Sequence, residues 1–328
     1  MSGDCIFRFG FISDIQYADI DDAMNFSKTE HRGYRDVLTH TETAISFWNA
    51  QEPTPLFIAQ LGDLIDGQNS GTYGQGLSLE EPQSKQAFEC VISRLIECTA
   101  PVYHTVGNHE LYNFSWAELK AHGNRKEDQQ MIAKEEMYFA FRPVSGWCCI
   151  VLNSYAISIM QDEESAGYQE AYRILSRHNK NFLTQGKVDY FEGLEGLERR
   201  FVPFNGGLGA EQIAWLRSEL NSCVRNREKV LIFVHNPLHP AAASEKNLAF
   251  DYDEVLQILH HESGKQVVAV CAGHYHRGGY TRDEHGIHHL TVQSPLTHGE
   301  CFGYVDVYAD RLEIKGQGAH RSHTCWYG

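Results

Sequence analysis

Five short polar motifs are the part of the sequence best equipped for chemistry. They are Ser13-Asp14-Ile15-Gln16, Gly62-Asp63-Leu64-Ile65-Asp66, Gly107-Asn108-His109-Glu110, Val234-His235-Asn236 and Gly273-His274-Tyr275-His276. Together they supply carboxylate, amide and imidazole groups, which are the side chains that hold divalent metals in proteins. Each motif alone has an ordinary explanation, such as an Asp that caps a helix after a strand. Their joint presence predicts a metal site, provided that the fold brings them together.

Each motif directly follows a short apolar stretch with the composition of a buried strand. These stretches are Ile6–Ile12, Leu56–Leu61, Val102–Val106, Val230–Val234 and Val267–Ala272. In open α/β sheets ligands bind at the carboxyl ends of the strands, because adjacent loops converge there. We therefore expect the five motifs to meet in one place.

Helical stretches alternate with these strands. They are Tyr34–Asn49, Gln83–Glu97, Ala210–Asn221 and Tyr252–His261. The alternation predicts an α/β fold with much of its sheet buried on both faces. Near the end of the chain, four consecutive strands are expected to form a meander that closes a second sheet. They are Gly279–Thr281, Ile287–Val292, Gly303–Tyr308 and Arg311–Ile314.

Two long segments interrupt the alternation. Residues 67–82 are rich in glycine, and residues 155–209 carry many aromatic and charged side chains around a short helix at Gln169–Ser176. Long excursions from a compact fold are often functional. Since the sequence has no Pro/Ser-rich linker and no repeat, we expect one domain over 1–328, with these two insertions shaping a substrate pocket.

Composition limits the class of ligand. The chain has 328 residues, of which 42% are hydrophobic and 22% charged, as in an ordinary globular protein. It has 28 Lys and Arg against 43 Asp and Glu, a formal net charge of −15. Because binding to nucleic acid requires clustered cations, we expect no nucleic-acid partner. A phosphate substrate would have to be held by a bound metal.

The nine cysteines and the amino terminus bear on the compartment. The cysteines are scattered through apolar stretches rather than spaced as a disulfide framework, so we expect reduced thiols. The first residues have no basic and apolar leader, and no apolar run approaches the roughly 18 residues that span a bilayer. We expect a cytoplasmic protein that does not associate with membranes.

In this order the motifs resemble the signature of the calcineurin-like metallophosphoesterase superfamily. That signature runs Asp-x-His, Gly-Asp-x-x-Asp, Gly-Asn-His-Glu/Asp, a lone His, and Gly-His-x-His. The resemblance extends from Asp14 to His276, and four of the five blocks match fully. It implies a four-layer sandwich, in which two mixed β-sheets are flanked by helices and insertions lie over the site.

The resemblance also implies two metal sites that share one carboxylate. Asp14, Gln16, Asp63 and His276 would hold one ion, and Asp63, Asn108, His235 and His274 the other. By the same resemblance His109 lies above the metals, where it stabilises the developing charge or protonates the leaving oxygen. Asp66 and Glu110 are expected to orient the ligands.

Gln16 departs from the family pattern, which usually has His at this position.

Two divalent cations about 3.5 to 4 Å apart can polarise a phosphoryl group and generate hydroxide near neutral pH. Mixed nitrogen and oxygen ligands suit Mn²⁺, Fe²⁺ or Zn²⁺, and the harder oxygen of Gln16 shifts the preference towards Mn²⁺ or Mg²⁺. We therefore expect two divalent ions, with manganese first. The alternative is that Gln16 is a polar residue beside a site that has lost one ligand.

Within the superfamily, Asp14-Ile15-Gln16, Gly-Asp-Leu-Ile-Asp-Gly and Gly-Asn-His-Glu-Leu-Tyr resemble the manganese-dependent ADP-ribose/CDP-alcohol diphosphatases. The implied reactions split ADP-ribose into AMP and ribose 5-phosphate, and CDP-alcohols such as CDP-choline or CDP-glycerol into CMP and a phosphoalcohol. Aromatic residues in the loops are candidates to stack on the base, although core packing is their commoner role. They are Phe26, Tyr73, Tyr190, Phe191 and Phe204.

Two other functions remain open from the sequence. A phosphomonoesterase or a cyclic-nucleotide phosphodiesterase would use the same metal ligands, so the ligands do not separate these enzymes from a diphosphatase. A catalytically inactive scaffold that binds proteins predicts missing ligands. Only position 16 departs from the family pattern here, and Gln is still a competent donor. The sequence points to no particular protein partner.

Overall fold

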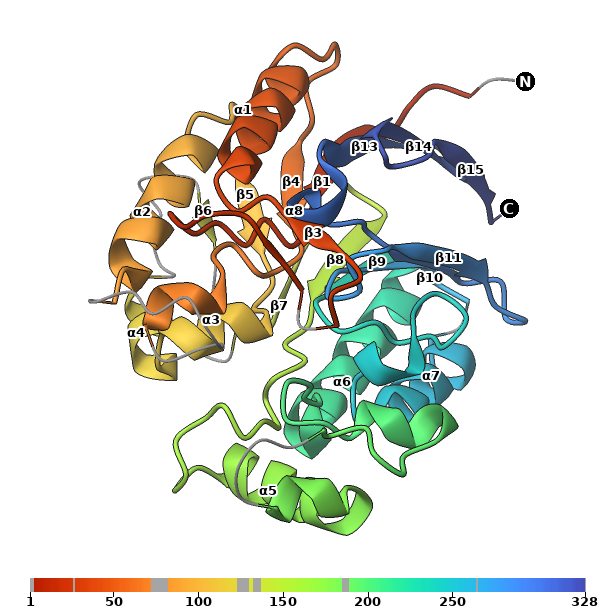
Figure 1. Cartoon of the computed structure of the whole chain (residues 1–328). Helices are drawn as coiled ribbons and strands as arrows, with labels where there is room; N and C mark the ends of the chain where they lie inside the picture. The colour runs from red at the N-terminus through yellow and green to blue at the C-terminus, as the bar shows by residue number, and fades with distance from the viewer. Residues whose placement is uncertain are drawn as a thin grey trace.

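Two β-sheets lie face to face, with helices on their outer sides (Figure 1). The computed structural model describes residues 3–25, 27–71, 82–122, 130–131, 137–184, 189–263 and 265–327. Among these residues, no helix is long and apolar enough to cross a membrane.

The first sheet has seven strands in the order β15-β14-β13-β1-β4-β5-β6. Strands β1, β4, β5 and β6 run parallel, whereas β13, β14 and β15 continue the sheet in antiparallel fashion from the other side of β1. The bounds are β1 Phe7–Ile12, β4 Phe57–Gln60, β5 Val102–His104, β6 Gln130–Met131, β13 Cys301–Val307, β14 Arg311–Gly318 and β15 His323–Trp326.

The second sheet has six strands in the order β11-β12-β10-β9-β8-β7. Its four central strands are parallel and its two edge strands antiparallel. The bounds are β7 Phe139–Phe141, β8 Trp147–Val151, β9 Lys229–Val234, β10 Val267–Ala272, β11 Gly279–Arg282 and β12 His288–Thr291. A separate short pair consists of β2 Ala23–Met24 and β3 His31–Arg32.

Helices cover the outer face of each sheet. Helices α1 and α2 pack on the seven-stranded sheet, and α6 and α7 pack on the six-stranded sheet (Figure 1). The bounds are α1 Asp36–Asn49, α2 Ser84–Leu95, α3 Asn108–Asn113, α4 Trp116–His122, α5 Ala166–His178, α6 Gly209–Asn226, α7 Tyr252–His261 and α8 Pro295–His298. Single 3₁₀ turns occupy Gly67–Ser70, Lys180–Leu183, Gly196–Arg200 and Glu245–Asn247.

Apolar side chains on both faces of the buried strands explain why the layers pack together. Successive side chains of a strand point to opposite faces of its sheet. In β9, Leu231 and Phe233 face the other sheet, whereas Val230 and Ile232 face the helices. The Phe9 ring stacks on Phe57 at 5.2 Å between ring centroids and meets Phe233 edge-on across the sheet interface. The four-layer α/β sandwich expected from the sequence is thus confirmed.

The five strands expected before the motifs are β1, β4, β5, β9 and β10. The predicted carboxyl-terminal meander is wrong. Strands β11 and β12 belong to the six-stranded sheet, and the helical turn α8 then carries the chain across to the other sheet, where β13 pairs with β1 (Phe7 opposite Val307). The helix expected at Gln169–Ser176 is the longer α5.

Candidate metal centre

All five motifs lie at the carboxyl ends of parallel strands, along one edge of the sandwich. Backbone hydrogen bonds tie the loops to one another. The N–H of Asp14 donates to the carbonyl oxygen of Gly62 at 3.0 Å, and the N–H of Gln16 donates to that of Asp63 at 2.9 Å. In the second sheet, the N–H of Gly273 donates to the carbonyl oxygen of His235 at 3.0 Å. The expected convergence of the motifs is therefore observed.

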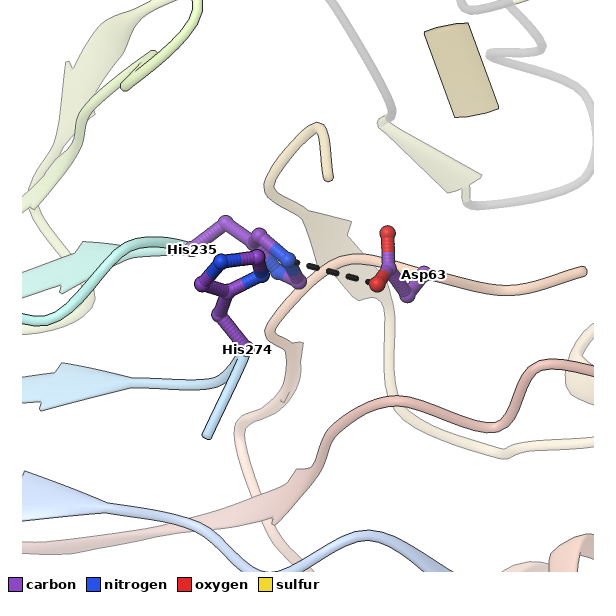
Figure 2. Close-up of side chains that lie close together, drawn as sticks. All are labelled: Asp63, His235 and His274. Carbon is purple, nitrogen blue, oxygen red and sulfur yellow. Dashed lines mark ion pairs between the residues drawn. The ribbon is translucent and has the colours of Figure 1, made fainter. Parts of the chain in front are cut away.

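Three buried side chains, Asp63, His235 and His274, form the centre of this site. Their candidate ligand atoms all lie within 4.8 Å of one another. Figure 2 shows the two imidazole rings side by side, with the carboxylate of Asp63 across from them. The Nε2 atom of His235 lies 3.4 Å from Oδ2 of Asp63. One oxygen and two nitrogen donors from two different sheets thus face a common point.

Hydrogen bonds behind the two imidazoles fix which nitrogen faces the site. Nδ1 of His235 lies 2.7 Å from the carbonyl oxygen of Leu61, so it donates, and in the neutral ring the lone pair lies on Nε2. Nε2 of His274 lies 2.8 Å from Oδ1 of Asn205, which leaves Nδ1 of His274 as the acceptor. Such partners orient histidines for metal binding.

Asn205 is a positioning residue that the sequence analysis missed. Its side chain is fully buried, and its Nδ2 donates to the carbonyl oxygens of Arg200 and Lys246, each at 2.8 Å. Its Oδ1 accepts from His274 and also from Nδ2 of Asn236 at 3.2 Å. Asn205 lies in the long 155–209 segment and outside every motif, so only the three-dimensional contact with His274 reveals it.

Gln16 and His276 extend the cluster from Oδ2 of Asp63, the oxygen that also faces His235. Nε2 of Gln16 donates to Oδ2 of Asp63 at 3.0 Å and lies 2.9 Å from Nε2 of His276. The same nitrogen of His276 is 3.6 Å from Oδ1 of Asp14. Four side chains expected around one ion are therefore contiguous.

The remaining expected ligand, Asn108, and the carboxylate of Asp14 are also held by neighbours. Oδ1 of Asn108 accepts a hydrogen bond from the buried Tyr155 hydroxyl at 3.2 Å. The carboxylate of Asp14 accepts from the Ser13 hydroxyl and from the backbone N–H of His274, the latter at 3.0 and 3.2 Å. These contacts fix the direction of both side chains.

The backbone at this site is strained. Asp14, Gln16, Asp63 and His274 all have positive φ, at 52°, 48°, 59° and 65°. The left-handed region costs a residue with a Cβ atom on the order of 1 kcal/mol, and such residues persist where the surrounding structure overdetermines them. Four of the seven expected ligands share this conformation, which indicates that strain is retained to aim them.

Two glycines permit the close approach of the ligand loops. A Cβ atom at Gly107, which precedes Asn108, would overlap the carboxylate of Asp63. A Cβ atom at Gly62 would overlap the ring of His235, and Gly62 also has a φ of 92°. Both glycines are therefore required for space, and Gly62 is also required for its positive φ.

Glu110 joins the second and third motifs through the backbone. Its Oε2 accepts from the N–H groups of Asp63 at 2.9 Å and Gly107 at 2.7 Å, and its Oε1 accepts from that of Leu64 at 2.5 Å. Burial and the nearby charge of Asp63 raise the pKa of Glu110 to about 7 against these three bonds. Glu110 thus positions the Asp63 loop from behind.

The charges of the site suit a cation. Burial alone would raise the pKa of Asp63, but the nearby imidazoles, chiefly that of His235, hold it well below its usual range. Burial raises the pKa of Asp14 to about 7, and the charge of Asp63 contributes to the increase. Burial lowers the pKa values of His274 and His276 well below normal, so these rings are neutral, as metal ligands must be.

His235 is shifted in the other direction. Burial would lower its pKa, but the adjacent carboxylate of Asp63 outweighs burial and raises the pKa to about 9. The carboxylate thus favours the protonated ring, whereas a cation beside Nε2 would require the neutral ring.

Unpartnered buried atoms test whether the site fits a metal. Nearly all buried polar atoms in proteins have a hydrogen-bond partner. Among the described residues, Oε1 of Gln16 and Nε2 of His235 have none, since the contact of His235 with Asp63 lacks hydrogen-bond geometry. Together with the carboxylates of Asp14 and Asp63, these atoms form a mixed oxygen and nitrogen donor set. Such a set fits divalent Mn, Fe or Zn better than Ca²⁺.

His109 lies beside the ligands. Its backbone N–H donates to Oδ1 of Asp63 at 2.9 Å, and its Nδ1 accepts from the backbone N–H of Gly67 at 2.8 Å. Nδ1 is also 3.4 Å from Oδ2 of Asp66, whose Oδ1 accepts from the N–H of Gln68. Because Nδ1 is an acceptor, the neutral ring carries its proton on Nε2.

Two of the five aromatic candidates lie near the site. The ring of Phe204 has its centroid 6.2 Å from that of His274, and Phe191 meets Phe204 at 6.0 Å. The cations of Arg199 and Lys246 lie 5.2 and 5.7 Å from the Phe191 ring centroid.

The other three aromatic candidates are Tyr190, Phe26 and Tyr73. Tyr190 is joined to its surroundings through its backbone carbonyl, which accepts from Asn179. Phe26 and Tyr73 lie outside the described residues.

Comparison with known proteins agrees with this geometry. The sequence pattern of the calcineurin-like phosphoesterase family matches residues 7–278. The chain belongs to that family.

Relatives extend the similarity over nearly the whole chain. The "Manganese-dependent ADP-ribose/CDP-alcohol diphosphatase" of Bos taurus is 36% identical over 97% of this chain and 93% of its own length. The protein of the same name from Arabidopsis thaliana is 33% identical over 95% of this chain and 94% of its own. A crystal structure of a dimetal phosphatase from Danio rerio superimposes with a TM-score of 0.88 at 33% identity, over 99% of this chain and all of that one.

Proposed function

We propose that the chain is a manganese-dependent diphosphatase that cleaves the diphosphate linkage of nucleotide conjugates. Its substrates are ADP-ribose, split into AMP and ribose 5-phosphate, and CDP-alcohols, split into CMP and a phosphoalcohol. The observation that carries the proposal is the buried cluster of Asp63, His235 and His274, in a chain that aligns almost end to end with relatives named for this activity.

The contacts described above support the ligand assignment that the family resemblance implies. Asp14, Gln16, Asp63 and His276 would hold one ion, and Asp63, Asn108, His235 and His274 would hold the other. When bound, two divalent cations neutralise charge on a phosphoryl group and lower the pKa of water. Manganese is favoured because the relatives are named manganese-dependent and because Gln16 offers an oxygen where the family usually has an imidazole.

His109 serves the leaving group. The backbone N–H of Gly67 donates to its Nδ1, so the proton of the neutral ring is on Nε2, from which it would pass to the leaving oxygen. The pair formed by Asp66 and Gly67 holds the ring in this orientation. A general acid placed in this way contributes about 10² to 10⁴ in rate.

The segment 155–209 forms the wall for the nucleotide. It supplies Phe204 and Phe191, which lie near His274, and Asn205, which orients that ring. Aromatic faces of this kind can stack on a base. Because the chain has a net charge of −15, bulk electrostatics cannot retain the substrate, and such contacts must supplement the cations.

A substrate panel tests the proposal. The purified chain with Mn²⁺ is incubated with ADP-ribose, CDP-choline, AMP, p-nitrophenyl phosphate and 3′,5′-cyclic AMP, and the products are resolved. We expect the highest kcat/KM for ADP-ribose or CDP-choline. Release of phosphate from AMP at equal efficiency would make the chain a phosphomonoesterase instead, and failure to turn over any compound would favour the scaffold. An Asp63→Asn variant, purified in parallel, controls for contaminating hydrolases.

A further inference from the structure

Two thiols and a carboxylate lie together at the edge of the sandwich opposite the candidate metal centre. They belong to Cys148, Cys223 and Glu228, and their candidate ligand atoms all lie within 4.8 Å of one another. Cys148 is near the amino end of β8, and Glu228 directly precedes β9, whose carboxyl end leads into His235. At about 3.3 Å per residue along a strand, the two sites are about 20 Å apart.

The backbone fixes the positions of these three groups. Cys148 pairs with Val230 of β9, and Cys223 lies in the last turn of α6. The chain leaves α6 after Asn226, and the N–H of Glu228 donates back to the carbonyl oxygen of Cys223 at 2.9 Å. Both cysteines are fully buried, whereas the side chain of Glu228 is 12% exposed. The cluster is therefore open to solvent at the carboxylate.

Hydrogen bonds link the three candidate ligand atoms to one another. The bond between the two thiols raises the pKa of Cys148 and lowers that of Cys223. Cys223 also bonds to the carboxylate of Glu228. Because cysteine binds metals as the thiolate, a metal ion at this point replaces the bridging protons, which pass to the solvent.

The charge of the cluster favours a divalent cation. As thiolates, Cys148 and Cys223 carry two negative charges, and Glu228 carries a third. Arg142 supplies one positive charge, since its Nη2 lies 3.2 Å from Oε2 of Glu228. One divalent ion neutralises the two negative charges that remain. The carboxyl end of α6 adds the partial negative charge of the helix dipole.

The donor set selects the kind of ion. Thiolates favour Zn²⁺, whereas Mn²⁺ prefers oxygen donors. Zn²⁺ binds sulfur at about 2.3 Å and carboxylate oxygen at about 2.0 to 2.2 Å, so one ion can bridge atoms within 4.8 Å of one another. Closed structural zinc sites have four protein ligands, whereas three protein ligands leave one position to water.

We propose that Cys148, Cys223 and Glu228 form a Zn²⁺ site that is separate from the candidate metal centre. The ion replaces the protons of the two thiols, and water completes its tetrahedral shell. Arg142 opposes binding, because it carries a like charge and engages the carboxylate of Glu228. The proposal goes beyond the diphosphatase function and does not depend on it, since none of the expected ligands of the metal centre is a cysteine.

Titration with Cd²⁺ as a spectroscopic probe for Zn²⁺ tests the proposal. Thiolate ligands give Cd²⁺ an ultraviolet charge-transfer band that carboxylate, amide and imidazole ligands do not give. The reduced chain, kept saturated with Mn²⁺, is titrated with Cd²⁺ and then with Zn²⁺. The test variants are Cys148→Ser, Cys223→Ser, Glu228→Gln and Arg142→Gln.

Two matched controls accompany these variants. Cys90→Ser removes a partly buried thiol of α2 that is outside the cluster. Glu219→Gln removes a carboxylate that also pairs with Arg142, at 3.4 Å, but is not part of the cluster. Circular dichroism and ADP-ribose turnover with Mn²⁺ are measured on every variant.

Wild type should show a band that saturates at one Cd²⁺ per chain and disappears as Zn²⁺ is added. The two serine variants should lose the band. Glu228→Gln should weaken Cd²⁺ binding at least about tenfold, since loss of even an outer partner of a metal ligand costs that much. Arg142→Gln should tighten binding about two- to fivefold, which a purely structural role of the cluster does not predict. Both controls should bind within about twofold of wild type.

The absence of a band in wild type overturns the proposal, and so does a band that persists in both serine variants. Glu228→Gln changes a partly exposed residue, so an unchanged affinity in this variant overturns the proposal even where a serine variant unfolds. A disulfide between Cys148 and Cys223 after purification under reducing conditions would identify a redox pair and also overturn it. ADP-ribose turnover should stay at the wild-type level throughout, so failure here is distinct from failure of the diphosphatase proposal.

Discussion

Nε2 of Gln16 lies 2.9 Å from Nε2 of His276, so two side chains expected on the same ion are in direct contact. The same nitrogen donates to Asp63, while Oε1 of Gln16 is buried without a partner among the described residues. A half-turn of the amide would bring the oxygen to face the carboxylate of Asp63. The amide oxygen of Gln16 and the carboxylate oxygen of Asp63 would then repel each other unless a cation lay between them. We therefore expect the orientation of the Gln16 amide to depend on bound metal.

The first prediction concerns metal choice at position 16. Gln16→His replaces a hard oxygen donor by an imidazole, which favours softer borderline ions. We expect the ratio of Mn²⁺-supported to Zn²⁺-supported kcat/KM to fall, about tenfold for a change of 1.4 kcal/mol in relative metal affinity. The check is a metal titration of activity together with bound metal measured by mass spectrometry. An unchanged metal profile would place Gln16 outside the coordination sphere.

The second prediction concerns the shared carboxylate. Asp63 contacts Gln16, His235 and the backbone of His109, so its loss removes the group common to both ions. Asp63→Ala should lower kcat at least about 10³-fold and reduce bound metal, with the circular dichroism spectrum retained. Near-normal turnover in this variant would contradict the two-metal assignment.

The third prediction separates His109 from the metal ligands. Its Nδ1 faces Gly67 and Asp66, so truncation removes an acid without removing a donor to the metal. His109→Ala should lower kcat about 10² to 10⁴-fold while bound metal stays at the wild-type level. Loss of metal from this variant, measured on the same samples, would instead identify His109 as a ligand.

The strands and motifs were predictable because they are local features. β1 and β10 are unbroken apolar stretches, and burial on both faces leaves that pattern in the sequence itself. The fold family was predictable because the order of the motifs is specific.

What could not be predicted depends on tertiary contacts. Nothing local distinguishes β13, which joins β1 about 300 residues earlier in the chain (Phe7 opposite Val307), from a strand of the neighbouring sheet. Strand β8 was not assigned, although it is fully buried between β7 and β9. Asn205 has its role only because His274 lies beside it.

The fourth prediction tests the space at the loop glycines. Gly107 has no positive φ, so Gly107→Ala adds only a methyl group, which would overlap Asp63. We expect a loss of about 1 to 3 kcal/mol in the free energy of unfolding, as for other overpacked sites, and weaker metal binding. Gly33→Ala is the control, because its methyl group makes only an ordinary contact with Asp36. If the two variants unfold at the same urea concentration, the Asp63 loop tolerates displacement and the steric argument is wrong.

The fifth prediction concerns Asp283, away from the site. Its Oδ2 accepts from Nε2 of His260 at 2.8 Å and of His289 at 3.0 Å, and its Oδ1 accepts from the N–H of Ile287 at 2.8 Å. Burial alone would raise the pKa of Asp283, but these bonds outweigh burial and hold it well below its usual range.

A carboxyl whose pKa is lower in the folded state stabilises the fold above its unfolded pKa of about 3.9 and loses that contribution as the pH falls further. Asp283→Asn replaces one carboxylate oxygen by an amide N–H group that faces the N–H groups of His260 and His289. It should therefore lower the free energy of unfolding by about 1 to 3 kcal/mol at pH 7. The check is urea unfolding of both proteins from pH 7 down to about pH 3. The difference between their free energies of unfolding should become smaller below about pH 4, since only the wild type loses the stabilisation by the Asp283 carboxylate there. If the difference in the free energy of unfolding stays constant across this pH range, the charge of Asp283 does not stabilise the fold.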